Sequence, residues 1–358
     1  MKTGTVSRIT DGSFRYQGWP TVCADENGRI YVASSSHRLG HICPFGKDYM
    51  YVSDDSGETW SVPAVINDTS YDDRDAGIVA LGGGRMLMTW FNHPRKFYLA
   101  RREKLVQSAG ENAPLMDGML KIWENLPDEA DECGSFVRLS EDGGKTWGEA
   151  IKVPVTSPHG PAPLRDGRLL YVGKEFLSGD PSLEPGSIYA FESRDGGRTW
   201  EKLSRIEFSE GCGSANYHEP HALELADGSI LAAIRVQGIK DTPDFTVHLC
   251  RSYDGGRTWT SPEATGIFGS PPHLLQLPSG EIVMTYGRRT APFGERAAIS
   301  RDGGKTFGDE RVISEESNSA DLGYPSSVCL PDGSVLTVYY QRYGNDKYDS
   351  VLYTKWKV

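Results

Sequence analysis

The chain has 358 residues and a formal net charge of −11 at pH 7, with 38% hydrophobic and 24% charged residues. This composition is ordinary for a globular protein, and an acidic excess without any run of Lys or Arg makes nucleic acid and anionic membrane surfaces poor partners. Six Cys without a C-x-x-C pair argue against a disulfide scaffold, and no stretch reaches the ~18 apolar residues of a membrane span. The start, MKTGTVSRITDGSFRY, shows no signal peptide. We therefore expect a cytoplasmic protein. A secreted or periplasmic protein whose signal peptide had been removed would show the same sequence features.

Six short segments combine a glycine turn with an apolar strand, which predicts a β-hairpin at each. They are ENGRIYVA (26–33), GGGRMLMTW (82–90), RDGRLLYVG (165–173), ADGSILAAI (226–234), PSGEIVMTY (278–286) and PDGSVLTVY (331–339).

A second repeat, S-x-D-x-G-x-T-[WF], follows each of the first five hairpins. It occupies 53–60, 140–147, 193–200, 252–259 and 300–307. The Asp is expected to accept hydrogen bonds from backbone N–H groups of its own turn, and the Gly permits positive φ there. The aromatic residue is expected to pack between sheets, so the repeat is a folding device and a poor candidate for catalysis.

Together the repeats predict an all-β, six-bladed β-propeller that forms a single domain over 1–358, with blades beginning near 19, 75, 160, 220, 272 and 324. The last blade is one strand short, and the N-terminal segment 5–10 can supply it and close the ring, which removes open sheet edges. An excursion over about 95–133 in blade 2 is helix-permissive. Whether it acts as a lid or only decorates the ring remains open.

The five S-x-D-x-G-x-T-[WF] repeats resemble the Asp-boxes of the sialidase (neuraminidase) superfamily, whose fold is a six-bladed propeller. The resemblance covers essentially the whole chain. It implies three arginines that bind a substrate carboxylate, a Tyr nucleophile activated by a Glu, and an Asp acid/base. An Arg fork matches a carboxylate bidentately, and a Tyr nucleophile is the known exception among retaining glycosidases.

In a propeller the innermost strands start around one axis, so the residues before them should converge at one mouth. The six segments are FRYQGWP (14–20), DDRDAG (72–77), SPHGP (157–161), NYHEPH (216–221), SPPH (270–273) and LGYPSS (322–327). They concentrate Arg, Asp, His, Glu and Tyr, which predicts a central polar site.

The resemblance assigns most roles residue by residue. Tyr324, at the start of blade 6, corresponds to the nucleophile. Glu219 precedes Arg235 by sixteen residues, in the order of the family's Glu and second Arg. The third Arg should lie in blade 5, where we favour Arg296, with Arg289 second.

Other site positions are less regular. Arg15 resembles the family's first Arg, although its Pro comes three residues late, and Arg74, in a mouth segment, is also expected to bind substrate. The family's Asp acid/base has no clean counterpart. His41 falls near its place in SSHRLGHICPFGKDY (35–49), Asp48 follows, and Asp73 and Asp75 of DDRDAG can also reach the mouth. We take His41 and Asp75 as the candidates.

Five histidines fall in predicted mouth loops: His41, His159, His218, His221 and His273. Hydrogen bonding to sugar hydroxyls, general acid/base catalysis and metal binding remain open for them. We expect His159, His221 and His273 to bind substrate. H-E-P-H lacks the helical geometry of H-E-x-x-H, and we expect neither a metal nor a cofactor.

The leading hypothesis is a sialidase-like exo-glycosidase that removes a terminal acidic sugar, sialic acid or a related sugar, from a glycan. A polysaccharide lyase or other glycoside-active enzyme that uses a His or Tyr base is the alternative. A non-catalytic glycan-binding propeller is the third. The expected partner is a glycan or small acidic saccharide.

Overall fold

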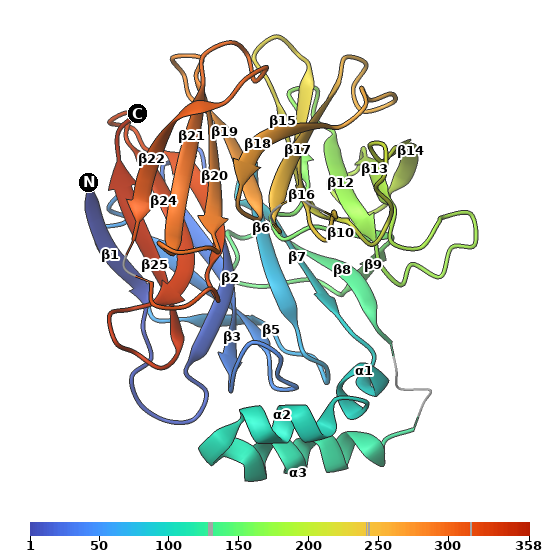
Figure 1. Ribbon diagram of the computed structural model, residues 1–358, viewed down its shortest axis with the longest axis vertical. Helices are drawn as coiled ribbons and strands as arrows, with labels where there is room; N and C mark the ends of the chain where they lie inside the picture. The colour runs from blue at the N-terminus through green and yellow to red at the C-terminus, as the bar shows by residue number, and fades with distance from the viewer. Residues whose placement is uncertain (128–131, 241, 243, 316) are drawn as a thin grey trace.

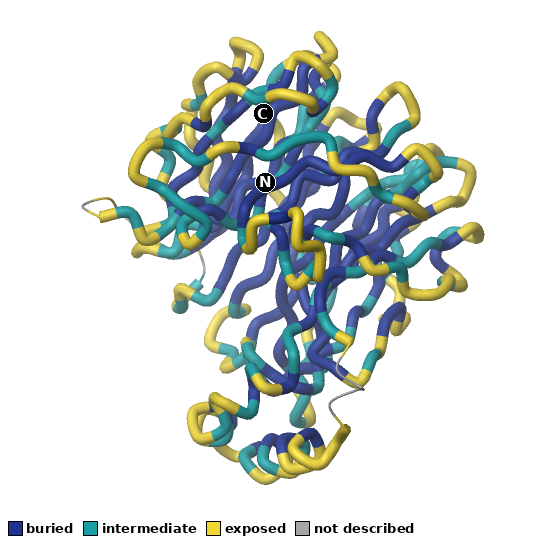
Figure 2. The backbone as a smooth tube through the Cα atoms, turned by 90° about the vertical axis from the view of Figure 1, so that its right-hand side faces the viewer, coloured by how far each residue is buried: buried dark blue, intermediate teal, exposed yellow. Residues whose placement is uncertain are grey.

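The computed structural model describes residues 1–358 except 128–131, 241, 243 and 316. Six small antiparallel sheets form a ring, which confirms the predicted six-bladed β-propeller (Figure 1). Figure 2 shows that most strand residues are buried inside the ring and that many residues of the connecting loops at its edges are exposed.

The first three blades are each built from strands that are consecutive along the chain, as the order of the repeats predicts. Blade 1 holds β2 (Tyr16–Ala24), β3 (Ile30–Arg38), β4 (Lys47–Ser53) and β5 (Ala64–Asn67); blade 2 holds β6 (Arg74–Gly82), β7 (Arg85–Asn92), β8 (Gly134–Ser140) and β9 (Ile151–Val153). Blade 3 holds β10 (Val155–Thr156), β11 (Ala162–Pro163), β12 (Leu169–Glu175), β13 (Ile188–Ser193) and β14 (Glu201–Ile206).

The other three blades complete the ring. Blade 4 holds β15 (Tyr217–Glu224), β16 (Ile230–Val236), β17 (Thr246–Ser252) and β18 (Glu263–Phe268); blade 5 holds β19 (Pro272–Gln276), β20 (Ile282–Arg288), β21 (Gly294–Ser300) and β22 (Gly308–Ser314). Blade 6 holds β23 (Gly323–Cys329), β24 (Val335–Arg342), β25 (Asp349–Trp356) and β1 (Lys2–Ser7).

The N-terminal strand closes the ring, as expected. β1 pairs antiparallel with β25, with Lys2 opposite Lys355 and Ser7 opposite Val351. The paired segment is 2–7 rather than the expected 5–10. This register buries Val6 in the core cluster of blades 6 and 1.

The five S-x-D-x-G-x-T-[WF] turns are built as the sequence predicts. In the turn of blade 4, Asp254 Oδ1 accepts the Thr258 backbone N–H at 2.9 Å and Oδ2 accepts the Thr258 hydroxyl at 2.6 Å. These bonds, the hydroxyl of Thr258 first, lower the pKa of Asp254 to about 2. Trp259 donates its indole N–H to Ser204 of blade 3, so the turn also joins neighbouring blades. The other four turns repeat the Thr contacts through Asp55, Asp142, Asp195 and Asp302.

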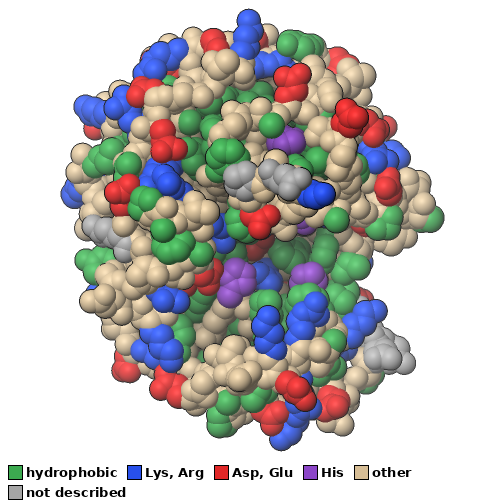
Figure 3. Space-filling view, viewed as in Figure 1, with side chains coloured by type: hydrophobic (Ala, Val, Ile, Leu, Met, Phe, Trp, Pro, Cys, Tyr) green, Lys and Arg blue, Asp and Glu red, His purple; other side chains and the backbone are tan. Residues whose placement is uncertain are grey.

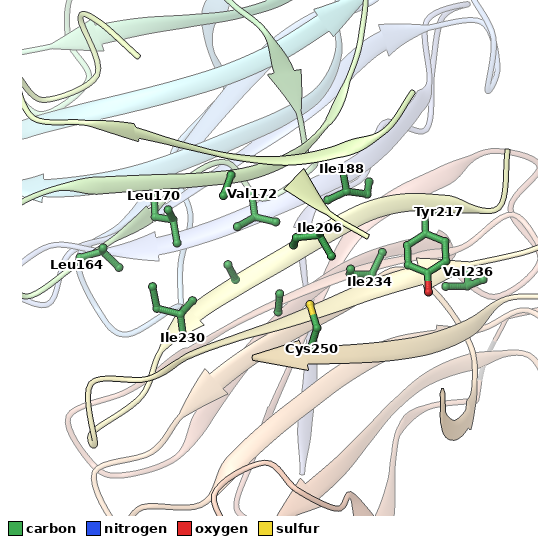
Figure 4. Close-up of a cluster of buried hydrophobic side chains, with 13 residues drawn as sticks. Leu164, Leu170, Val172, Ile188, Ile206, Tyr217, Ile230, Ile234, Val236 and Cys250 are labelled. Carbon is green, nitrogen blue, oxygen red and sulfur yellow. The ribbon is translucent and has the colours of Figure 1, made fainter. Parts of the chain in front are cut away.

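The hydrophobic core lies in layers between adjacent blades. Between blades 3 and 4, strand residues such as Leu170, Val172 and Ile188 pack against Ile230 and Ile234 (Figure 4). Every second residue of these strands points into the gap because side chains alternate across a strand. The two blades thus share one apolar layer.

The excursion between β7 and β8 carries helices α1 (Arg95–Leu99), α2 (Arg102–Ser108) and α3 (Ala113–Glu124), with a 3₁₀ turn at Gly110–Asn112. They lie together below the ring in Figure 1. Leu105, Leu120 and Trp123 pack with Leu39 and Cys43 of the β3–β4 loop. Positions 128–131 of the expected insertion lie outside the described residues. Among the described residues, no helix has the length and apolar character needed to cross a membrane.

Candidate functional site

Four innermost strands share an irregularity at their starts. The antiparallel register shifts between Gly18 and Thr21, Arg74 and Gly77, His218 and His221, and Gly323 and Ser326. Inside each shift one residue has a left-handed backbone, with φ of 51° at Trp19, 55° at Asp75, 45° at Glu219 and 51° at Tyr324. Such a conformation costs roughly 1–2 kcal/mol per residue and collects at functional sites, and a bulge re-aims its side chain. The chain therefore uses one device four times to turn side chains toward a common mouth.

Tyr324, Glu219 and Arg235 form a hydrogen-bonded chain across blades 6 and 4. The Tyr324 hydroxyl donates to Glu219 Oε1 at 2.6 Å, and Arg235 Nη1 donates to Glu219 Oε2 at 2.6 Å. Burial and then the nearby carboxylates of Glu219 and Asp75 hold the pKa of Tyr324 well above its usual value. Burial alone would raise the pKa of Glu219, but the Arg235 cation and the Tyr324 hydroxyl outweigh it and lower that pKa. The arrangement is a neutral phenol in contact with an ionised carboxylate.

Arg289 is a second cation, after Arg235, beside the hydrogen-bonded Tyr324 and Glu219. Its guanidinium carbon lies 5.8 Å from the Tyr324 ring centroid, and both Arg289 and Arg235 face the Phe245 ring, at 5.5 and 4.8 Å. Arg296, the favoured third arginine, does not reach the mouth. It is buried within blade 5, where it donates to the Ser314 carbonyl at 2.9 Å and pairs with Glu315 at 2.7 Å. The expectation that Arg296 reaches the mouth is wrong because its guanidinium is bonded to the outer strand of blade 5 and the residue after it, and Arg289 is the blade 5 arginine that lies beside Tyr324.

Arg15 also lies away from Tyr324. It precedes β2, pairs with Glu111 of the insertion at 3.3 Å and stacks over Tyr348 at 4.5 Å. The bulge of β2 directs Trp19, not Arg15, toward the mouth, which corrects the expectation. Arg74 is buried and lies 4.6 Å over the Trp19 ring, on the blade 1 and 2 side of the mouth.

Asp75 is a buried carboxyl at the mouth. Its Oδ1 has no hydrogen-bond partner among the described residues. Burial raises its pKa to about 7, helped by the Glu219 charge and opposed by the Arg74 and Arg38 cations. The carboxyl therefore titrates near neutral pH, as a proton-transfer group should.

His41 is held by Asp321. The two are 2.9 Å apart, Nδ1 to Oδ1, and the hydroxyls of Tyr16 and Tyr340 donate to the same carboxylate at 3.1 and 2.9 Å. Burial would raise the pKa of Asp321, but its His41 and Tyr340 contacts lower it to about 2. Desolvation lowers the pKa of His41, while Asp321 opposes that shift. Trp19 stands between the pair and Tyr324, with ring centroids 4.9 Å from His41 and 6.3 Å from Tyr324.

The other acid/base alternatives lie elsewhere. Asp48 is bonded to Ser35 and Asn67 within blade 1. Asp73 accepts hydrogen bonds from the backbone N–H and the hydroxyl of Thr69. Both are structural contacts.

Three of the predicted mouth histidines pack against one another and not against the hydrogen-bonded Tyr324 and Glu219. They are His159, His221 and His273. Their ring centroids are 4.2–5.3 Å apart. Together with Thr21 and Ser327 they line a cavity of about 340 Å³. This corrects their expected contact with substrate at the mouth. His221 lies two residues beyond the bulge of β15, while His159 and His273 belong to blades 3 and 5, whose innermost strands β11 and β19 pair without a register shift, so no bulge turns these rings toward Tyr324. Burial lowers the pKa of all three, so the rings are neutral. Among the described residues no group of His, Cys, Asp and Glu has a geometry that fits a metal ion.

Sequence reasoning missed Trp19, Asp321 and two cations. Arg38 forms a buried ion pair with Asp72 and lies 4.8 Å over the Trp19 ring. Lys174 donates to the Tyr217 carbonyl at 2.8 Å, and burial lowers its pKa to about 8. One signal was available, since Trp19, Glu219 and Tyr324 all precede a proline. The face of Figure 3 is hollowed between the blades and the helices, and His, Arg and Lys side chains gather there.

Comparisons with known proteins agree with this architecture. Residues 123–337 match the family described as BNR repeat-like domain. A sialidase from Micromonospora viridifaciens is 27% identical in a 222-residue alignment that covers 52% of this chain and 33% of that protein. The chain thus spans about a third of the length of this curated relative.

Solved structures resemble the chain over nearly its full length. A Dyadobacter fermentans protein of unknown function has a TM-score of 0.76 at 24% identity, covering 99% of this chain and 97% of that one. The NanB sialidase of Streptococcus pneumoniae gives 0.69 at 13%, covering 99% and 70%, and an α-L-arabinanase of Penicillium chrysogenum complexed with arabinobiose gives 0.62 at 14%, covering 99% and 98%. At these identities the likeness shows the fold alone.

The family match extends over more than half of the chain, and the six blades agree with it. The chain therefore belongs to the BNR repeat-like family, within the sialidase superfamily of six-bladed propellers.

Proposed function

We propose that this protein is a retaining exo-glycosidase that removes a terminal acidic sugar, sialic acid or a related sugar, from a glycan. The observation that carries the proposal is the chain Tyr324–Glu219–Arg235, with 2.6 Å at both contacts. Phenol, carboxylate and guanidinium in this order match an activated nucleophile beside an anion-binding group.

The sugar carboxylate is bound by Arg235 and Arg289, which flank Tyr324. A neutral phenol is a suitable nucleophile here because a carboxylate would repel the substrate's own anion. The Tyr324 oxygen attacks the anomeric carbon while Glu219 accepts the phenolic proton. The bond to the leaving oxygen breaks, and that oxygen takes a proton. Water then attacks the tyrosyl sugar and gives a proton to the group that protonated the leaving oxygen, Glu219 returns its own proton to the phenol, and the configuration is retained.

The proton for the leaving oxygen comes from His41 in this proposal. Asp321 fixes the imidazole orientation, and the ring lies partly exposed against Trp19, on the side where we place the leaving group. Because burial lowers the pKa of His41 from its ordinary value, kcat/KM should be highest at acidic pH. The basic limb should move in His41→Asn, whereas in Asp75→Asn it should stay; the opposite pattern would transfer the role to Asp75.

The test is turnover of a panel of aryl glycosides of acidic sugars, with a 2,3-difluoro sugar acid as the trapping reagent. We expect hydrolysis of at least one aryl glycoside and a mass adduct on the peptide that contains Tyr324. Tyr324→Phe should abolish both while substrate still binds. Hydrolysis without an adduct would show that no covalent tyrosyl intermediate forms. If neither hydrolysis nor an adduct is seen, the proposal is refuted.

A lyase is the second candidate, and one observation favours it. The imidazole of His41, neutral above its lowered pKa and oriented by Asp321, is also a suitable base for a proton α to a uronate carboxylate. The arginines would then neutralise that carboxylate. Ultraviolet absorbance of an unsaturated product, with no adduct on Tyr324, would identify this reaction.

A further inference from the structure

A cavity of about 430 Å³ lies between the helical insertion and the rim of blades 1 and 6. Its inner wall contains Tyr16, His41 and Asp321, and its outer wall contains Arg101 and Lys104 of the insertion. The apolar side chains of Leu105 and Met116 in this wall belong to the core that anchors the helices to blade 1. The cavity is therefore a formed space with a fixed wall on each side.

The lining is basic although the chain is acidic overall. Four cations line it, Arg101, Lys104, Arg342 and Lys347, and one ionised carboxylate, Asp321, is already bonded to His41. Lys347 lies 3.7 Å from Glu111, and Arg101 caps the Phe97 carbonyl at 2.8 Å. Lys104 has no ion pair within the part of the chain that the structure describes. An anion would find uncompensated positive charge here.

Asp349 is a buried group aimed into the same cavity. It is 2% exposed, and its Oδ1 has no hydrogen-bond partner among the described residues. Burial and then the Asp321 charge raise its pKa to about 8, while the Arg342 and Arg289 cations oppose that shift. The carboxyl is thus largely protonated at neutral pH and can donate a hydrogen bond. A buried polar atom without a partner is costly, so a ligand oxygen at this point would be stabilised.

The cavity adjoins the Tyr324 site through two rings. Trp19 contacts Tyr324 on one side and His41 on the other, and His41 is part of the cavity wall. A sugar bound at Tyr324 whose leaving oxygen faces His41 would therefore continue into this space.

We propose that this cavity binds the sugar unit on the leaving-group side of the scissile bond, and that this unit carries its own anionic group, a carboxylate or a sulfate. The inference rests on the proposed function and narrows it. The natural substrate is then an acidic oligosaccharide or polysaccharide rather than a neutral conjugate with one terminal acid.

The test measures binding to the Tyr324→Phe protein, so that no substrate is consumed. The probes are a fluorescent oligouronate tetrasaccharide, a sulfated tetrasaccharide of the same length, and the acidic monosaccharide. Lys104→Glu is compared with Lys145→Glu, which makes the same charge change in the outer turn of blade 2, away from the cavity.

We expect Lys104→Glu to weaken binding of one tetrasaccharide roughly fivefold at about 50 mM salt, the upper end for one exposed charge contact, with a smaller effect at high salt. The loss should exceed that for the monosaccharide, and Lys145→Glu should match the parent. The tetrasaccharide whose binding is weakened shows whether the anionic group of the leaving-group sugar is a carboxylate or a sulfate.

Equal affinities of Lys104→Glu and Lys145→Glu for both tetrasaccharides, or no binding of either by the parent, would overturn the inference. Failure of the proposed function looks different. In that case wild-type protein turns over no aryl glycoside, while the Lys104-dependent tetrasaccharide binding persists.

Discussion

The three axial histidines predict a defined sensitivity to acid, best measured at His159. This ring is buried against His221 and His273, and burial lowers its pKa to about 3 from the ordinary 6.5. A group whose folded-state pKa is depressed favours the folded chain above the unfolded pKa, and this contribution is lost as pH falls toward the folded pKa. The slope is about 1.4 kcal/mol per pH unit below pH 6.5, so between pH 7 and pH 5 His159 costs about 2 kcal/mol.

The wild-type pH profile alone cannot display this, because buried carboxyls act in the opposite direction. Asp73 and Asp75 have pKa values of about 7 and Asp349 of about 8, chiefly because they are buried. Their folded forms take up protons before the unfolded chain does, which stabilises the fold as pH falls below those values. The measurable quantity is therefore the difference between a variant and the wild type.

The variant is His159→Gln, which keeps a polar side chain of similar size and removes the titration. Urea unfolding at pH 7 and pH 5 gives the two free energies of unfolding. We expect the difference between variant and wild type to move about 2 kcal/mol in favour of the variant at pH 5. His37→Gln serves as control, since that ring is half-buried and its pKa is lowered less. A difference for His159→Gln that is the same at both pH values would refute the reasoning.

Three further predictions concern the mouth and the turns. Glu219→Gln should lower kcat on the responsive aryl glycoside by about 10²–10⁴-fold, the usual contribution of a general base; a loss under tenfold would remove this role. Arg289→Lys should raise KM for the same substrate, because a bidentate contact is lost, while Arg296→Lys should leave the kinetic constants alone and lower the unfolding free energy by about 1–3 kcal/mol; equal kinetic effects of the two would contradict the geometry. Asp254→Ala should cost about 1–2 kcal/mol of stability in urea unfolding, from turn donors left without their acceptor, and a fall in kcat with an unchanged thermal midpoint would speak against a purely structural turn.

The repeats made the fold predictable because each is a local signal. A glycine turn with an alternating strand, or an Asp that bonds its own turn, needs no distant partner to form. The meeting of Tyr324 and Glu219 at the mouth was predictable for a related reason, since each opens an innermost strand and such strands must converge in a propeller. The roles expected of them come from the family resemblance.

Other parts of the site depend on register and depth, which the sequence does not display. Arg289 follows the end of β20 and Arg296 lies within β21, so the point at which the strand ends decides which of them reaches Tyr324. Glu219 and His221 are two residues apart, yet one lies at the mouth and the other on the axis. The pairing of His41 with Asp321 joins positions 280 residues apart, and no local pattern announces it.

The closure of the ring by β1 has a consequence for how the protein is made. β1 precedes the other strands of the ring and pairs with β25, with Lys2 opposite Lys355, so blade 6 cannot be finished until β25 has been translated. Blade 6 also supplies Tyr324 from β23. Until then the nascent chain carries an unpaired sheet edge, which is an aggregation hazard, and contacts between such distant residues form slowly. The Tyr324 site should therefore reach its final geometry only after β25 has been made, and fusions that restrain residues 2–7 should lower the yield of folded protein more than the amount synthesised.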